Sequence, residues 1–118
     1  MAEALEWLAG FEERTIRRFA PFDAVLTPAL ALTPRPVGWY DAHDGERNFA
    51  QQVQYTPYTS FVNVAGLPAI TVPVEETAAG APMGVQLIGR PGGESTLFAI
   101  AAQLERRVRR RHRHPPNW

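Results

Sequence analysis

The stretch that decides the fold runs from Tyr58 to Gln86 and reads YTSFVNVAGLPAITVPVEETAAGAPMGVQ. It contains the segment 69–74 (AITVPV) and the start of the segment 84–89 (GVQLIG). Both segments are rich in β-branched residues and bounded by proline and glycine. This pattern predicts two β-strands. Antiparallel pairing is the simplest connection, although the nine residues between them are long for a tight hairpin. Pro73 cannot donate to a neighbouring strand, so we expect it at the strand's end or on a sheet edge.

Helical patterns flank these strands on both sides. Apolar residues recur at helical spacing over residues 2–19 and, most clearly, over about 94–110. Between the first helix and the strands, Asp23-Ala-Val-Leu-Thr27 is a short apolar run bounded by prolines, which predicts a third, buried strand.

The middle of the chain is less regular. Prolines and glycines make residues 28–45 a loop. Residues 46–56 predict a short helix with Phe49 and Val53 on its inner side, and a further helical segment ends near Gly66, a residue that commonly terminates helices.

Three strands and two longer helices predict an α/β protein, and 118 residues correspond to one domain. The strands are apolar on both faces, as in sheets that are covered on both sides. A sheet of three such strands standing alone would leave open edges and exposed apolar patches.

The composition excludes several classes of protein. The chain has no cysteine, which excludes disulfides and thiolate metal sites. The N-terminal residues do not resemble a secretory signal, and no apolar stretch approaches the ~18 residues needed to span a bilayer. We therefore expect a soluble, cytoplasmic protein without a membrane partner.

The charge is distributed unevenly. Twelve arginines balance twelve acidic residues, but six of the arginines fall between Arg106 and Arg113. Such a cluster could bind phosphates or another anionic partner. Because it continues an amphipathic helix and suits the negative end of the helix dipole, we favour a charged helix end over a nucleic-acid site. Residues 111–118 form a short basic, proline-containing tail.

Five short patterns, in this order, resemble the C-terminal part of the amidase signature hydrolases. They are Asp23-Ala-Val-Leu-Thr-Pro28, Asn63-Val-Ala-Gly-Leu-Pro-Ala69, Pro82-Met-Gly-Val-Gln-Leu-Ile-Gly89, a final helix with Glu94, Leu97, Ile100, Leu104 and Glu105, and His114-Pro-Pro116. The departures, Glu75, Glu76 and Ala81, lie in one loop. The resemblance implies that residues 1–118 are a C-terminal segment of the amidase signature domain, with about three short strands of a mixed sheet flanked by two longer helices.

The resemblance also implies a chemistry that this chain lacks. Family members use a nucleophilic serine in a Gly/Ser-rich segment, a second serine in a cis peptide and a proton-transferring lysine, without metal or cofactor. This chain has no lysine and only two serines, Ser60 and Ser95, neither in such a segment. Arginine cannot replace the lysine because it stays protonated. We therefore assign no catalytic residue, expect no amide hydrolysis by the chain alone, and expect its partner to be the missing N-terminal catalytic part.

In the family, residues just before the Asn-x-x-Gly pattern line part of the substrate pocket. The matching residues here are Tyr58, Thr59 and Val62. The alternative, which we favour, is that they pack on the sheet. We expect Asn63 to cap the following turn through its side chain, and Gly66 and Pro68 to shape the backbone.

Histidines beside acidic residues raise the question of a metal site. His43 lies between Asp41 and Asp44, but a metal needs several convergent ligands and a loop does not ensure them. His112 and His114 alternate with arginines, which repel a cation. We assign no metal site.

Three functions remain open from the sequence. The preferred one is the C-terminal portion of an amide hydrolase. The second is a stand-alone, non-catalytic module that forms a homo-oligomer and binds an anionic partner through its arginine-rich helix end. The third is part of a glutamine-dependent amidotransferase subunit.

Overall fold

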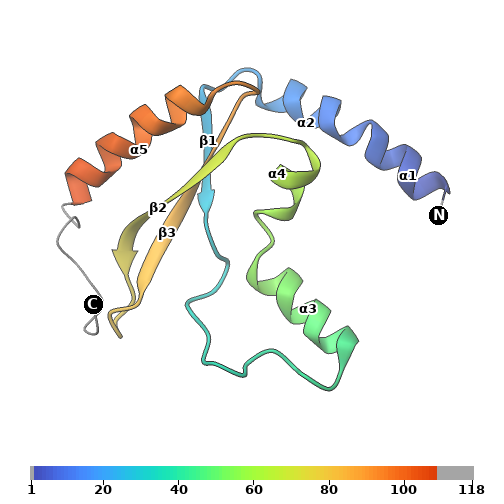
Figure 1. The fold of residues 1–118 in the computed structure, drawn as a ribbon, viewed down its shortest axis with the longest axis vertical. Coiled ribbons are helices and arrows are strands. Elements are labelled where there is room, and N and C mark those ends of the chain that lie inside the picture. Colours follow the sequence, from blue (N-terminus) through green and yellow to red (C-terminus); the bar gives the residue numbers. More distant parts are fainter. Residues whose placement is uncertain (1, 109–118) are drawn as a thin grey trace.

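The computed structural model describes residues 2–108, which form an open α/β arrangement (Figure 1). In chain order the elements are α1 (Ala2–Ala9), α2 (Phe11–Phe19), β1 (Ala24–Pro28), α3 (Gly45–Tyr55), α4 (Ser60–Val64), β2 (Ala69–Glu76), β3 (Pro82–Gly89) and α5 (Glu94–Val108). The predicted α/β class is confirmed.

The three strands form one sheet in the order β1-β3-β2. Both pairings are antiparallel, with Val25 of β1 opposite Ile88 and Val72 of β2 opposite Val85. The described residues thus hold an antiparallel sheet, and the mixed pairing implied by the resemblance is not seen within them. The five-residue turn 77–81 joins β2 directly to β3, and such a short connection permits only antiparallel neighbours.

Pro73 lies on an edge strand, as predicted, because β2 is the outermost strand on its side of the sheet. The pairing register shifts between Pro73 and Glu75, which marks a bulge or irregularity. Beyond it the strand continues to Glu76, and the turn is closed by the N–H of Thr77, which donates to the carbonyl of Ala81 at 2.8 Å. The hairpin is therefore longer than the sequence pattern predicted.

Helices cover the central strand on both faces. The long helix α5 packs over β2 and β3 and buries Leu97 and Ala101. The other face carries the core cluster of Val62, Ala65, Leu67 and Ile88, against which α2 also packs. Figure 1 shows α5 and α4 on opposite sides of the sheet.

The sequence predicted a single helix over residues 2–19. This prediction is wrong in one respect, since the structure has two helices separated at Gly10. Gly10 has φ −92° and ψ 0° and separates α1 from α2. Glycine lowers helix stability because it loses the most backbone entropy on folding. The Nη2 of Arg14 donates to the carbonyl of Trp7 at 2.7 Å across the break.

Helix α3 lies within one residue of its predicted bounds, but its predicted inner face is wrong. The side chain of Asp44 caps its start by accepting the N–H of Arg47 at 3.0 Å. Phe49 and Val53 are 67% and 53% exposed. Polar contacts from Gln51 hold this helix to the preceding loop instead, so its apolar residues face outward among the described residues.

Candidate functional site

The segment predicted to line a pocket is anchored to the centre of the sheet by one buried amide. Gln86, on β3, is 4% exposed. Its Nε2 donates to the carbonyl oxygen of Tyr58 at 2.8 Å and to Oγ1 of Thr27 on β1 at 3.2 Å. A buried amide that holds a backbone carbonyl fixes the position of the segment that carries it.

The three predicted pocket residues occupy different environments. Tyr58 and Thr59 are half-buried, and Thr59 immediately precedes α4. Val62 is 3% exposed and belongs to the core cluster on the Ile88 face. Of the three, Tyr58 and Thr59 therefore offer partly accessible surface, while Val62 packs in the core.

Sequence reasoning did not assign Gln86 a place in this site. The signal that could have found it is its setting, a single amide within the otherwise apolar strand segment GVQLIG. A polar side chain at the centre of a buried strand needs hydrogen-bond partners, and those partners mark the backbone that it holds.

The turn after α4 returns the chain to β2. Gly66 has φ +60°, a backbone conformation that favours glycine, and its N–H donates to the carbonyl of Asn63 at 3.2 Å. The carbonyl of Pro68 accepts the N–H of Gly89 at 2.8 Å. Asn63 has an exposed side chain and its hydrogen bonds within residues 2–108 are made by its backbone, so a side-chain cap stays a prediction.

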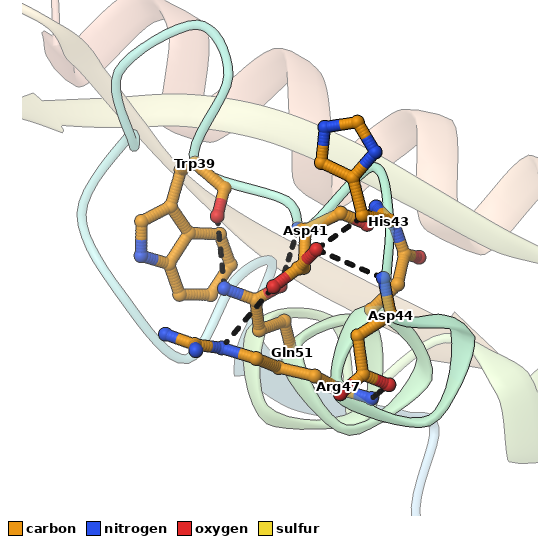
Figure 2. Close-up of polar contacts among 7 residues, drawn as sticks. Trp39, Asp41, His43, Asp44, Arg47 and Gln51 are labelled. Atoms are coloured by element: carbon orange, nitrogen blue, oxygen red, sulfur yellow. Dashed lines mark hydrogen bonds and ion pairs between the residues drawn. The ribbon is translucent and has the colours of Figure 1, made fainter.

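The loop before α3 is organised around the carboxylate of Asp41 (Figure 2). Its Oδ1 accepts the N–H groups of His43 at 2.9 Å and Asp44 at 3.0 Å, and its Oδ2 lies 3.6 Å from Nε of Arg47. The hydrogen bonds from the His43 and Asp44 backbones, with a smaller contribution from the Arg47 charge, hold the pKa of Asp41 below its usual value.

In this arrangement the carboxylates of Asp41 and Asp44 accept hydrogen bonds from backbone N–H groups and are not arranged as metal ligands. Figure 2 shows the imidazole of His43 directed away from the Asp41 carboxylate. Among residues 2–108 no three His, Cys, Asp or Glu side chains cluster in a way that could hold a metal ion.

Polar and aromatic contacts complete the loop. Gln51 on α3 donates through Nε2 to the carbonyl of Trp39 at 2.8 Å and accepts the N–H of Asp41 at 2.8 Å. The rings of Trp39, Tyr40 and Tyr55 lie 5.1–6.3 Å apart, centroid to centroid. The loop is therefore tied to α3 at several points.

The two serines are not brought together. Ser60 begins α4 and Ser95 lies in the first turn of α5, on the opposite side of the sheet. With no lysine in the chain, the described residues hold no serine-lysine arrangement for nucleophilic catalysis.

The arginine-rich end is described only in part. Arg106 and Arg107 lie in the last turn of α5 and are exposed. The remaining arginines, His112, His114 and the 111–118 tail lie outside the described residues. Over the part of the chain that the structure describes, none of the helices has the length and apolar character needed to cross a membrane.

Comparison with known proteins identifies the family. A family model described as Amidase matches residues 1–98. The chain belongs to the amidase family. This confirms the resemblance drawn from the five sequence patterns.

Individual relatives agree with this assignment. The amidase-family protein AmiB2 of Mycobacterium tuberculosis (strain ATCC 25618 / H37Rv) is 40% identical over 97 residues, which cover 82% of this chain and 21% of AmiB2. A glutamyl-tRNA(Gln) amidotransferase subunit of Methylocella silvestris is also 40% identical, over 81% of this chain and 18% of its own length.

Solved structures of amidase relatives share the fold. The structure of 6-aminohexanoate cyclic dimer hydrolase superposes with a TM-score of 0.84 at 26% identity, and the match covers 98% of this chain but 26% of that one. The chain thus spans about a fifth of its curated relatives and about a quarter of this solved structure.

Proposed function

We propose that this chain is the C-terminal portion of an amidase-family amide hydrolase, which cleaves a carboxamide to a carboxylate and ammonia or an amine. In this proposal the chain supplies strands, the covering helix α5 and part of the substrate pocket. The nucleophile and the proton-transferring group belong to a part of the fold outside the chain, and the chain alone is inactive.

One observation carries the proposal. Nearly the whole chain, 98%, matches 26% of a solved amidase relative, while the chain contains no lysine. Nucleophilic attack by a serine needs a neighbouring base that is neutral when it accepts the proton. The family uses the neutral amine of a lysine, whereas the twelve lysine-or-arginine positions of this chain are all arginine, which does not deprotonate in proteins.

The surface supports a role as part of a larger structure. The accessible area is 8905 Å², whereas a compact monomer of 13.1 kDa exposes roughly 6400 Å². The radius of gyration of 17.0 Å exceeds the ~13 Å of a compact domain of this length. Large apolar side chains remain exposed on several elements, including Trp7, Phe22, Leu26 and Phe98.

The pocket role rests on Tyr58 and Thr59. Both are half-buried, and Gln86 holds the Tyr58 carbonyl from the centre of the sheet. A wall held in this way can keep its shape when a substrate binds, which favours specific recognition. Val62 contributes by anchoring α4 in the core.

A second candidate, part of a glutamine-dependent amidotransferase subunit, is favoured by a separate observation. The Methylocella silvestris amidotransferase subunit is as similar in sequence as AmiB2, at 40% identity. The structure of the corresponding Thermotoga maritima protein superposes with a TM-score of 0.67 over 85% of this chain. In this case the amide cleaved would be that of glutamine.

The experiment is a complementation assay. Purified chain is tested alone and after co-expression with AmiB2 that lacks the segment matching this chain, using benzamide and glutamine as separate substrates. We expect no ammonia from the chain alone and ammonia only from the co-expressed pair. Release from benzamide favours the amidase, and release from glutamine favours the amidotransferase.

Two results would overturn the proposal. One is ammonia release by the chain alone, free of contaminating hydrolases. The other is the absence of any complex with the AmiB2 part, together with a homo-oligomer of defined size in chromatography and salt-sensitive anion binding. That second result would establish the stand-alone module instead.

A further inference from the structure

The two outer strands of the sheet, β1 and β2, differ in whether their outer edges can form hydrogen bonds with a further strand. The N–H of Ala29 donates to Gly84 at 3.0 Å, and the N–H of Gly89 donates to Pro68 at 2.8 Å. In antiparallel pairs the hydrogen-bonded and non-hydrogen-bonded positions alternate. Even-numbered residues of β3 therefore bond to β1, and odd-numbered residues bond to β2.

This alternation identifies the outward-facing backbone of β1. Leu26 is opposite Leu87, an odd-numbered residue of β3, so the N–H and C=O of Leu26 point away from the sheet. The same holds for Ala24 and for Pro28, the last residue of the strand, which has no N–H to offer. No hydrogen bond within residues 2–108 engages these outward groups, so the β1 edge is free to accept another strand.

Apolar side chains flank this free edge. Leu26 is 59% exposed and Phe22, just before the strand, is 57% exposed. Helix α5 packs over β2 and β3 and leaves the Leu26 side of β1 uncovered. The start of β1 is fixed to the end of β3, since Nε of Arg90 donates to the Phe22 carbonyl at 2.9 Å. The open edge is thus both held in place and apolar.

The outer edge of β2 is interrupted part-way along the strand, whereas the outward proline of β1, Pro28, stands at the strand's end. By the same alternation, its outward positions are those of Ala69, Thr71 and Pro73. Pro73 has no N–H to offer a further strand, and the register shift that follows it interrupts the edge. Glu75 and Glu76 place two negative charges at its end. Proline, irregular pairing and charge are features that block the addition of a strand.

We propose that the outer edge of β1, and not that of β2, is where a β-strand from the remaining part of an amidase-family chain joins the sheet. This inference rests on the proposed function. The occupant follows from size, because the chain accounts for 26% of a solved relative that it matches over 98% of its own length. Backbone hydrogen bonds to Leu26 and Ala24 connect the added strand to β1, and the side chains of Leu26 and Phe22 become buried.

Hydrogen exchange on the wild-type chain tests the proposal at single amides. In the chain alone we expect the outward N–H groups of Leu26 and Thr71 to exchange rapidly. In the complex with the AmiB2 part we expect exchange at Leu26 to slow at least about tenfold, with little change at Thr71. Protection at Thr71 but not Leu26, in a complex that forms, overturns the edge assignment and leaves the proposed function standing.

A pair of proline substitutions supplies the matched variants. Leu26→Pro removes an outward N–H and an exposed side chain without removing a bond to β3, and Thr71→Pro does the same on the other edge. We expect L26P to abolish complex formation and T71P to preserve it. The reverse pattern overturns the proposal, and so does concentration-dependent protection of Leu26 in the chain alone, which would make a second copy the occupant. If the wild-type chain forms no complex and is instead a homo-oligomer of defined size with salt-sensitive anion binding, the proposed function fails as well.

Discussion

The side-chain amide of Gln86 donates a 2.8 Å hydrogen bond to the carbonyl oxygen of Tyr58, 28 residues earlier in the chain. The same nitrogen reaches Oγ1 of Thr27 on β1. One buried group on the central strand therefore ties together an edge strand and the segment that leads into α4. This link connects the sheet to the predicted pocket wall.

Replacing this amide should destabilise the chain. Gln86→Met keeps a similar shape but removes the donor to Tyr58 and Thr27, so their oxygens lose a buried partner. We expect a loss of about 1–3 kcal/mol in the free energy of unfolding, measured by urea denaturation. Gln54→Met, at an exposed position of α3, is the control and should change it by less than about 0.5 kcal/mol. Equal effects at both positions would contradict the role given to Gln86.

The close approach of α5 to β3 depends on Gly89. A Cβ added there would lie 3.1 Å from Cγ and 3.2 Å from Cδ1 of Leu97, tighter than ordinary van der Waals contact. We expect Gly89→Ala to lower the melting temperature, with a cost of about 1–3 kcal/mol from overpacking. Gly45→Ala is the matched control because a Cβ at Gly45 has no neighbouring atom within 4 Å. A melting temperature unchanged by G89A would refute this packing argument.

Two adjacent residues of α5 should respond differently to truncation. Leu97 is 2% exposed and Phe98 is 66% exposed. Leu97→Ala removes packed methyl groups and leaves a cavity, which costs about 2–5 kcal/mol. Phe98→Ala should cost less than about 1 kcal/mol in the isolated chain. Chemical denaturation of both variants checks the prediction, and a larger loss for Phe98→Ala would mean that α5 packs by a different face.

Asp41 should titrate at lower pH than an ordinary aspartate. Its folded-state pKa is lowered chiefly by the hydrogen bond from the His43 backbone, then by that from Asp44. The stabilisation from its charged form is therefore present above the unfolded pKa of about 3.9, and is lost as the pH falls through the lower folded value. Carboxyl NMR shifts should give a midpoint below the ordinary aspartate value of 3.8.

Asp41→Asn separates the charge from the hydrogen bonds. The asparagine oxygen can still accept the N–H groups of His43 and Asp44, but it cannot titrate. The amide shifts of these two residues should then lose the part of their pH dependence that comes from the Asp41 carboxyl. A midpoint at or above 3.8 in the wild-type chain would show that the loop does not favour the charged form.

Local sequence patterns predicted most of the helices and strands, because residue preferences and helix caps act between residues that are close in the chain. Residues 69–74 and 84–89 are β-branched and bounded by proline and glycine, and both are strands. Helix α3 begins where Asp44 caps it. The break at Gly10 was missed because the apolar repeat continues across it, while the cost of one glycine in a helix is only about 1 kcal/mol.

The faces of the helices could not be predicted with the same success. Phe49 and Val53 have the spacing of a buried stripe, yet they are exposed among the described residues because polar contacts from Gln51 hold α3. An amphipathic pattern indicates that one side of a helix favours burial, but not which surface covers it. In a chain that spans a fifth of its relatives, that surface can lie in another part of the fold.

By itself the amino-acid sequence determined the family, the order of strands and helices, and the absence of a lysine for proton transfer, since each is a property of residue types and their spacing. Only the tertiary structure decided the strand order β1-β3-β2 and the joining of Gln86 to Tyr58. Both depend on which distant segments pair, and the free energy of such pairing comes from burial and hydrogen bonds across the sheet rather than from any local stretch.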